Sequence, residues 1–221
     1  MAENLGTSTK VKTHTVYKNA AGKRVPGVTT ILGVVDKPAL IYWAWDLGSQ
    51  GIDFRKYRDE KADIGTLAHA MITGWISGNE PTTWEYSADI ISQAENSVLS
   101  FYAWLGEREY ELGFVEEPLI SEILQVGGTC DIYWKIDGLW TLDDLKTGKA
   151  IYGEHKAQAS IYGDILRENG WPVDRVRIIN VPRVEDENFD VQEVQPYTWP
   201  KYREFFRACQ VIYNTRKTLK M

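Results

Sequence analysis

The stretch GGTCDIYWKIDGLWTLDDLKT, residues 127–147, decides the fold, because it reads as two strands joined by a tight turn. Apolar and polar residues alternate on both sides of Asp137-Gly138, a dipeptide typical of two-residue hairpins. Counting outward from this turn places Asp131 directly opposite Asp144, so the hairpin is expected to bring two acidic side chains together on one face.

Two carboxylates that face each other across a hairpin lie about 4.5–5.5 Å apart at Cβ and destabilise the sheet unless something neutralises them. Either one acid is protonated or a cation lies between the two, and a hard divalent ion with oxygen ligands is a common solution. Lys146 shares the face of Asp144, two residues away. Two alternatives stay open. The hairpin could lie at the surface with Lys146 as a counter-ion, or the register could slip so that Asp131 faces Asp143 or Leu145.

The rest of the chain predicts helices before this hairpin and one further helix–strand–helix passage after it. Helices are expected over about 38–48, 64–76, 87–110, 154–169 and 200–218, and strands over 114–123, 174–182 and 190–195. Asp36 is a candidate cap for the first of these helices, and the apolar run 28–35 is left unassigned. This order predicts an α/β fold with a central mixed sheet, a three-strand meander and flanking helices. We expect one domain over 13–221, after a disordered segment 1–12.

Two helices place polar residues where they could reach the paired acids. In the helix over 154–169, Gln158 and Tyr162 fall one turn apart on the apolar face, where an amide needs a hydrogen-bond partner. Gln158 could cap a buried carbonyl, or both side chains could reach toward the carboxylates. His69 lies at the edge of the apolar stripe of the helix over 64–76, a position that suits either an interface residue or a ligand.

Composition indicates a soluble protein and excludes several classes. The 221 residues are 43% hydrophobic and 25% charged, without an apolar run of about 18 residues or a signal peptide, so no membrane partner is expected. Two cysteines are too few for a disulfide framework or an all-cysteine iron–sulfur cluster, which indicates a reducing, cytoplasmic location. The net charge of −6 is unevenly spread, with +4 over residues 1–24 and +5 over residues 201–220. Basic ends could contact an anionic polymer or could simply keep the protein soluble.

Nine tryptophans and twelve tyrosines raise the question of base stacking. Most of them, including Trp75 and Trp134, lie on apolar faces and are expected in the core. Tyr42, Trp43 and Trp45, near the start of the first long helix, are the best candidates for exposed rings.

Four short motifs occur in an order that resembles one nuclease superfamily. They are GTLAH (65–69), GTCD (128–131), DLK (144–146) and QASIY (158–162), and their order is similar to that of the PD-(D/E)XK nucleases, in particular the RecB-type and phage exonuclease branch. The resemblance spans about residues 65–162 and implies a restriction-endonuclease-like fold. The chain departs from the superfamily pattern at Cys130, where a proline is usual, and Asp143 beside Asp144 leaves a one-residue ambiguity.

The resemblance implies a metal centre. Asp131, Asp144 and the backbone carbonyl of Leu145 would hold one or two Mg²⁺ or Mn²⁺ ions, and His69 would complete the ligand set. Glu117, on the preceding strand, would support these ligands as a further carboxylate. Relatives with an iron–sulfur cluster use four cysteines, so no cluster is expected.

The same resemblance implies catalytic roles and a substrate. Lys146 would orient the attacking water or stabilise charge on the phosphate, while Gln158 and Tyr162 would position the strand or the ligands, and Asp131 and Asp144 would take part as metal ligands. The implied activity is a DNA nuclease, an exonuclease by its nearest resemblance, that leaves 5′-phosphate ends in recombination, repair or replication, with a phage source also implied. A catalytically silent module that binds DNA ends or proteins, and a Schiff-base enzyme using Lys146, remain alternatives. Strand polarity, preferred DNA form and oligomeric state stay open.

Overall fold

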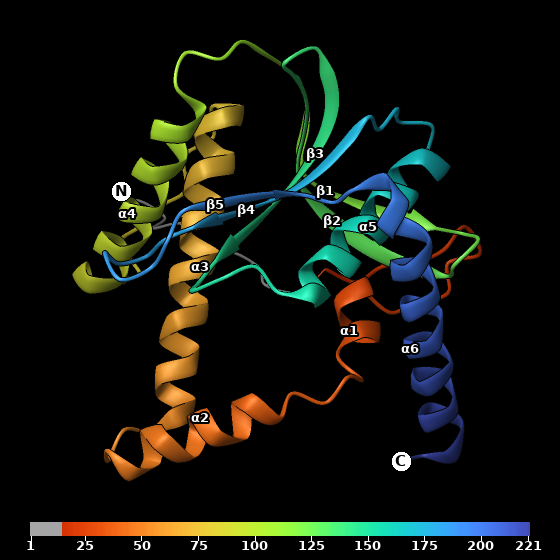
Figure 1. Cartoon of the computed structure of the whole chain (residues 1–221), viewed down its shortest axis with the longest axis horizontal. Coiled ribbons are helices and arrows are strands. Elements are labelled where there is room, and N and C mark those ends of the chain that lie inside the picture. The colour runs from red at the N-terminus through yellow and green to blue at the C-terminus, as the bar shows by residue number, and fades with distance from the viewer. Residues whose placement is uncertain (1–14) are drawn as a thin grey trace, which may run out of the picture.

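A computed structural model describes residues 15–221 as a mixed α/β fold around one five-stranded sheet (Figure 1). The strands lie in chain order across the sheet: β1 (Tyr110–Ser121), β2 (Val126–Ile136), β3 (Leu139–Thr147), β4 (Arg175–Val181) and β5 (Asp190–Glu193). The first three strands form the predicted antiparallel meander, β4 runs parallel to β3, and β5 is antiparallel to β4. The predicted fold class is confirmed. The segment 1–12 lies outside the described residues, and the single domain over 13–221 stays a prediction.

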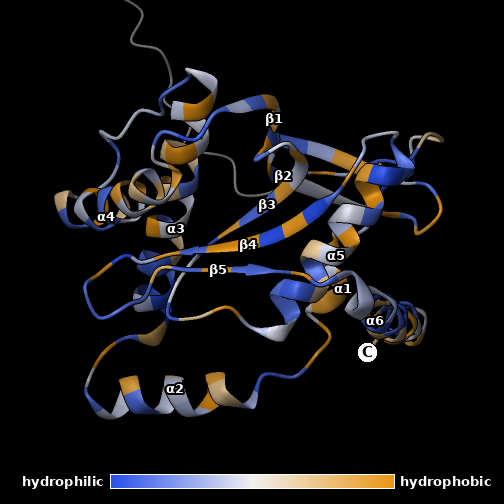
Figure 2. Ribbon diagram, turned by 45° about the horizontal axis from the view of Figure 1, so that its top comes forward, coloured by the Kyte–Doolittle hydropathy of each residue, from blue (hydrophilic) through white to orange (hydrophobic). Residues whose placement is uncertain are grey.

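Helices cover both faces of the sheet, and each face has its own apolar core (Figure 2). The helices are α1 (Val28–Leu32), α2 (Pro38–Ser49), α3 (Phe54–Ser77), α4 (Ala88–Leu105), α5 (Gly153–Glu168) and α6 (Trp199–Leu219), with a 3-10 turn at Pro196–Thr198. Buried residues of α1, α5 and α6 pack on one face, and those of α3 and α4 pack on the other. Among the described residues, none of the helices combines the length and apolarity needed to cross a bilayer.

The register of the β2–β3 hairpin is the predicted one. Ile136 pairs with Leu139, and the ladder continues to the pair of Ile132 and Asp143, so no one-residue slip occurs. Asp137 and Gly138 both have positive φ angles, 55° and 79°, as a two-residue primed turn requires. Because the turn is fixed by two residues, the identity of every cross-strand neighbour along the hairpin follows from it.

Three helix ends differ from the sequence-based expectation. Helix α3 begins ten residues earlier than expected, where the Asp53 carboxylate caps it by accepting hydrogen bonds from two backbone N–H groups, 2.8 and 3.1 Å away. Helix α4 ends at Leu105 instead of 110, because Gly106 adopts a positive φ of 55° and β1 starts at Tyr110. The N-cap position of α2 is Lys37 and not Asp36, and no side chain forms a capping hydrogen bond there. The apolar run 28–35 contains the short helix α1.

A buried ion pair fixes β3 between its two neighbours. The Arg177 guanidinium donates two hydrogen bonds, of 2.7 and 2.6 Å, to the Asp143 carboxylate, which also accepts one from the Trp134 indole at 2.7 Å. Asp143 is fully buried and lies on the face of α3 and α4, so it is not available to the carboxylate pair. The one-residue ambiguity between Asp143 and Asp144 is thereby resolved.

We expect Arg177→Lys to lower the free energy of unfolding by about 1.5–3 kcal/mol, because lysine keeps the charge but cannot form both bonds to a buried carboxylate. Urea denaturation measures the change. The matched control is Arg203→Lys, since Arg203 makes a similar two-bond contact with Asp164 but is 41% exposed. The control should cost less than about 1 kcal/mol. An equal loss in both variants would contradict the assigned role of burial.

Candidate metal centre

The site lies where the β2–β3 ladder ends. The last pair of the ladder is Ile132 and Asp143, and Asp131 and Asp144 are the next residues on the side away from the turn. Instead of forming an ordinary cross-strand pair, the Asp131 carboxylate accepts a hydrogen bond from the backbone N–H of Leu145 at 2.7 Å. Both acids are buried, Asp131 at 9% exposure and Asp144 at 1%. The two acids are near enough for the charge of Asp131 to raise the pKa of Asp144, but a contact of Asp131 with the residue after Asp144 replaces the expected cross-strand pair.

Lys146 supplies the positive charge of the cluster. Its ammonium contacts the Asp144 carboxylate and donates a 3.1 Å hydrogen bond to the carbonyl of Leu145. Burial by itself would lower the pKa of this ammonium, but the charges of Asp144 and Asp131 outweigh it and raise the pKa. Burial raises the pKa of the Asp144 carboxyl to about 6, with the Lys146 charge opposing the rise and the Asp131 charge adding to it. Excess negative charge thus remains in the cluster even with the ammonium in place.

Glu116 is the acid that the sequence-based prediction missed. Val115 pairs with Ile132 and Glu117 pairs with Cys130, so Glu116 lies between them at the position opposite Asp131. Its φ of 51° is positive, which locally distorts β1 at this residue. Glu117 was the predicted supporting carboxylate, but the structure places Glu116 in the cluster instead, because the register of β1 sets the neighbouring residue beside Asp131.

His69, Glu116 and Asp131 form a set of potential ligands. One ligand atom from each lies within 4.8 Å of the others, and His69 Nδ1 is 3.9 Å from Asp131 Oδ2. Glu116 is partly open to solvent, yet the desolvation of its carboxyl and the charges of Asp131 and Asp144 raise its pKa to about 8. Burial and the Lys146 charge lower the pKa of His69 to about 4, so its ring is neutral at pH 7 and keeps a free lone pair.

Helix α5 brings Gln158 and Tyr162 to the other side of Asp144. The Gln158 amide donates to the Tyr162 hydroxyl at 3.0 Å and reaches Asp144 Oδ1 at 3.5 Å, the limit of a hydrogen bond. The first residue of the GTCD motif makes room for this arrangement. A Cβ on Gly128 would lie 2.3 Å from the Tyr162 ring, so only glycine allows the ring to lie against β2 here. The predicted approach of both side chains to the carboxylates is thus present in the structure.

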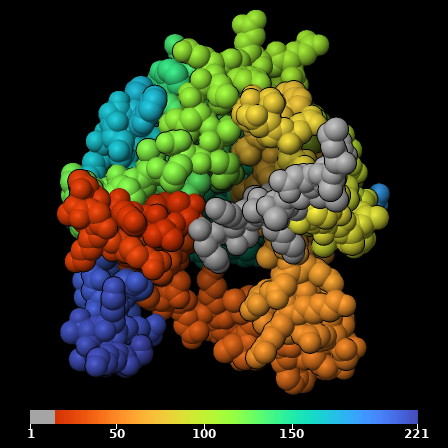
Figure 3. Space-filling model, turned by 180° about the vertical axis from the view of Figure 1, so that it is seen from behind, coloured from red at the N-terminus to blue at the C-terminus, as the bar shows by residue number. Residues whose placement is uncertain are grey.

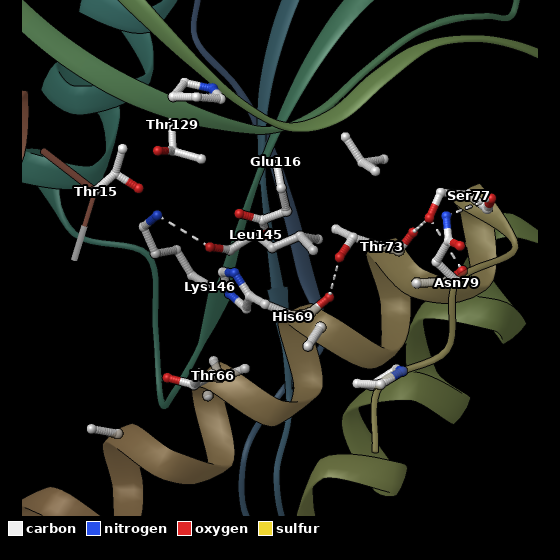
Figure 4. Close-up of a pocket in the computed structure, with 18 of the residues that line it drawn as sticks. Thr15, Thr66, His69, Thr73, Ser77, Asn79, Glu116, Thr129, Leu145 and Lys146 are labelled. Atoms are coloured by element: carbon white, nitrogen blue, oxygen red, sulfur yellow. Dashed lines mark hydrogen bonds between the residues drawn. The ribbon is translucent and has the colours of Figure 1, made fainter. Parts of the chain in front are cut away.

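His69, Glu116, Leu145 and Lys146 line a cavity of about 950 Å³ between α3 and the sheet. Figure 4 shows His69, Glu116, the Leu145 carbonyl and Lys146 pointing toward one another in its middle, with Thr15 to one side. One face of α3 forms a wall of the cavity, with lining residues spaced three or four apart along the helix. Glu116 and Lys146 are therefore reachable from this cavity, whereas Asp131 and Asp144 are buried and do not line it.

The donor set suits a hard divalent cation. Carboxylate and carbonyl oxygens with one neutral imidazole are ligands for Mg²⁺ or Mn²⁺, and the imidazole shifts the preference somewhat toward Mn²⁺. Asp144 Oδ2 is buried and, apart from its contact with the Lys146 ammonium, has no hydrogen-bond partner. Asp131 is shared by two sets of contacts: it forms a potential ligand set with His69 and Glu116, and it accepts a hydrogen bond from the Leu145 N–H and acts electrostatically on Asp144.

The basic segments near the two ends of the chain meet beside this cavity. Arg24 and Lys217 line a second cavity of about 560 Å³, which shares Thr15 with the first. Lys10 and Lys12, which contribute to the expected basic N-terminal segment, lie outside the described residues. A contact of these segments with DNA stays a prediction.

The aromatic residues divide between core and surface largely as expected. Trp134 is fully buried, whereas Trp75, expected in the core, is 42% exposed and packs against Tyr102. Among the three rings expected at the surface, Tyr42 and Trp45 are each 73% exposed. The third, Trp43, is partly buried against α3.

Comparison with known proteins adds little to this geometry. No protein-family model matches the chain, and no curated protein matches it. Among solved structures, one named "Putative exonuclease", from Eubacterium rectale, is similar with a TM-score of 0.47 and 14% identity, covering 65% of this chain and 63% of that one. A second, named SSO0001, has a TM-score of 0.27 and 15% identity over 65% of this chain and 75% of that one. The chain thus spans less than two thirds of the first of these structures, and both likenesses are too distant to indicate its chemistry.

Proposed function

We propose that the chain is a DNA nuclease that depends on Mg²⁺ or Mn²⁺ and belongs to the PD-(D/E)XK superfamily that its motifs resemble. The observation that carries the proposal is the cluster of Asp131, Asp144 and Lys146 at the end of one hairpin, beside a cavity that Lys146 and Glu116 line. A cluster with this much buried negative charge is costly to the fold, which supports a functional reason for its presence. Recombination, repair or replication of DNA, including that of a phage, is the proposed setting.

The residues have distinct roles in the proposed hydrolysis. Asp131, Asp144 and the Leu145 carbonyl would hold the metal, with His69 and Glu116 completing its ligands. When bound, the ion would lower the pKa of a water molecule and neutralise charge on the phosphate. The water oxygen attacks phosphorus, the bond to O3′ breaks, and a proton passes to O3′, which leaves a 5′-phosphate and a 3′-hydroxyl.

Lys146 and α5 prepare the site for this step. The ammonium of Lys146 stays charged at pH 7, because its pKa is raised, and it lies where it can orient the water or stabilise the phosphate. Gln158 contacts both Asp144 and Tyr162, so it would hold that carboxylate in place and present an amide to the strand. The same raised pKa disfavours the Schiff-base alternative, which needs a lysine whose pKa is lowered.

Digestion of end-labelled single- and double-stranded DNA with Mg²⁺, Mn²⁺ or EDTA tests the proposal. We expect cleavage with either metal, none with EDTA, and products that carry 5′-phosphates and are therefore ligated without kinase treatment. The pattern of labelled products also separates exonuclease from endonuclease action and gives the strand polarity. DNA binding without cleavage under all metal conditions would favour the alternative of a catalytically silent module that binds DNA ends or proteins.

A further inference from the structure

One end of the cavity beside the metal centre is built from three elements. Strands β3 and β4 run parallel and pair as far as Thr147 and Val181, so the residues that follow them leave the sheet at the same edge. Helix α3 crosses this edge closely, because a Cβ on Gly65 would lie 2.6 Å from the Thr147 hydroxyl. Lys61, one turn before Gly65, and Arg183, two residues after β4, both line the cavity. This end therefore carries two cations.

The positive charge at this end exceeds the negative charge that matches it. Arg183 forms an ion pair with Glu187, whose side chain is 4% exposed and also accepts a 2.9 Å hydrogen bond from the Arg183 backbone N–H. The pKa of the Lys61 ammonium is lowered by burial and then by the charge of Arg183. Three acids act on Lys61 in the opposite direction without offsetting this, namely Glu187, Asp89 and Glu60. An anion bound here would stabilise both cations.

Both cations keep hydrogen-bond donors for such an anion. The Lys61 ammonium donates to the Gln93 side-chain oxygen at 3.0 Å and lies 5.4 Å from the centre of the Tyr57 ring, and both of these partners are uncharged. Arg183 uses Nε and one terminal nitrogen for Glu187, and within the described part of the chain its other terminal nitrogen has no hydrogen-bond acceptor. Free N–H groups on an ammonium and a guanidinium are the donors that bind phosphate.

The opposite end of the cavity is neutral. The metal centre lies between the two ends, and the cavity beyond it is lined by Thr73, Ser77 and Asn79 (Figure 4). These side chains carry hydroxyl and amide groups and no charge. Along α3, the cationic groups therefore flank the metal centre on one side only, which gives a bound anionic strand a preferred direction along this helix.

The spacing along α3 sets how far the two cations lie from the metal centre. Lys61 and His69 are eight residues apart on this helix, which corresponds to a rise of about 12 Å. A stacked DNA strand advances about 3.4 Å per nucleotide, so this distance spans about three to four nucleotides. The molecular surface is hollowed beside the first half of α3, where Lys61 lies (Figure 3). A strand held at the metal centre has room to continue along this side.

We propose that Lys61 and Arg183 bind one backbone phosphate of the DNA strand, about three to four nucleotides from the phosphate that is cleaved. This inference rests on the proposed nuclease function for its ligand and goes beyond it in assigning a second phosphate subsite and the residues that form it. Lys61 is a positioning residue, because its ammonium lies too far from the metal centre to act on the reacting atoms. The protein then favours substrates that extend by at least this length on one side of the cleaved bond.

The salt dependence of DNA binding in EDTA tests this subsite without any cleavage. The logarithm of the binding constant falls linearly with the logarithm of the salt concentration, by about 0.7 per contacted phosphate for a single strand and about 0.9 for a duplex. Lys61→Met should reduce the slope by about one such unit and weaken binding at least about threefold at about 0.1 M salt. Fluorescence anisotropy of a labelled oligonucleotide, as a single strand and as a duplex, measures both quantities.

Further variants control for charge and folding. Lys61→Arg keeps the cation and should keep the salt slope of the wild type. Lys135→Met removes the same charge from the hairpin, outside the cavity, and should also keep the slope. Circular dichroism checks that each variant is folded, and Lys61→Gln repeats the test if methionine is not tolerated. An unchanged slope in Lys61→Met, an equal fall in Lys135→Met, or no DNA binding by the wild type would overturn the proposal.

The length of the shortest good substrate gives a second, separable readout. With Mn²⁺, kcat/KM of the wild type should rise at least about fivefold when an oligonucleotide reaches about five nucleotides, because the strand then spans both phosphate positions. Lys61→Met should lose this step through KM and not through kcat. A step that persists in Lys61→Met, or is missing from the wild type, would overturn the subsite and keep the nuclease function. A salt slope that falls as expected, without cleavage of any oligonucleotide, would remove the nuclease function and keep the phosphate contact.

Discussion

Replacing Lys146 with methionine should lower DNA cleavage about 100- to 1000-fold at saturating metal, because removal of one fixed charge beside a reacting phosphate has this size of effect. Methionine keeps most of the volume and flexibility of the side chain, so the packing around it should survive. The loss should appear in kcat, and the metal concentration at half-maximal rate should not rise, since the Lys146 ammonium is not a ligand. Gel-based digestion at several Mn²⁺ concentrations measures both quantities.

The stability of this variant should depend on metal in a characteristic way. Without metal, Asp144 loses the contact with its buried counter-ion, so the melting temperature should fall below that of the wild type. Addition of Mn²⁺ should restore part of the loss, because a dication can take over the neutralisation of Asp144. Lys135→Met is the control on the same sheet, since Lys135 pairs with Trp140 and lies outside the cluster. Full activity of Lys146→Met would refute the assigned role.

The hairpin part of the site could be predicted because its register is set locally. Asp137-Gly138 can form only a narrow class of turns, and the period of two along each strand then fixes which residues share a face. The predicted positions of Asp131, Asp144 and Lys146 follow from this local information. Tyr162 follows from helical spacing in the same way, since its distance along α5 from Gln158 is one turn.

Glu116 could not be predicted because the connection from β1 to β2 has no comparable signal. The ladder resumes with Ser121 and Val126, so four residues, 122–125, form the turn. Nothing in the sequence of this turn fixes its length, and an error of one residue exchanges Glu116 for Glu117. A four-residue turn places Glu116 opposite Asp131.

The first half of α3 escaped prediction for a different reason. Residues 54–63 are mainly charged and lack the apolar stripe that marks a helix packed on a core. Their helical structure depends on the Asp53 cap and on Trp43, which packs on Phe54 and Tyr57 from another helix. Tertiary contacts of this kind are not readable from local periodicity.

Glu116→Gln should reduce the stabilisation of the protein by metal, whereas Glu117→Gln should leave it intact. A ligand at 100 times its dissociation constant stabilises a protein by about 2.7 kcal/mol, which shifts the melting temperature of a chain of this size by about 5–11 °C. We expect the wild type and Glu117→Gln to show such a shift with Mg²⁺, and Glu116→Gln to lose more than half of it. Both substitutions remove one negative charge at neighbouring positions in the sequence. A difference between the two variants therefore reports the place of Glu116 in the cluster and not the change in surface charge.

The metal-free protein should respond in the opposite direction. At about pH 8.5, above the raised pKa of about 8, the Glu116 carboxyl carries a charge that Asp131 and Asp144 repel. Glutamine removes this repulsion, so Glu116→Gln should melt at a higher temperature than the wild type in EDTA, while Glu117→Gln should not. Scanning calorimetry with EDTA or Mg²⁺ measures both effects on the same samples. If Glu116 is a metal ligand, Glu116→Gln should be more stable than the wild type without metal and should gain less stability when metal is added. If Glu116 were a purely structural carboxylate, its neutralisation would lower the stability under both conditions. Glu116→Gln with an undiminished metal shift would exclude Glu116 from the metal centre.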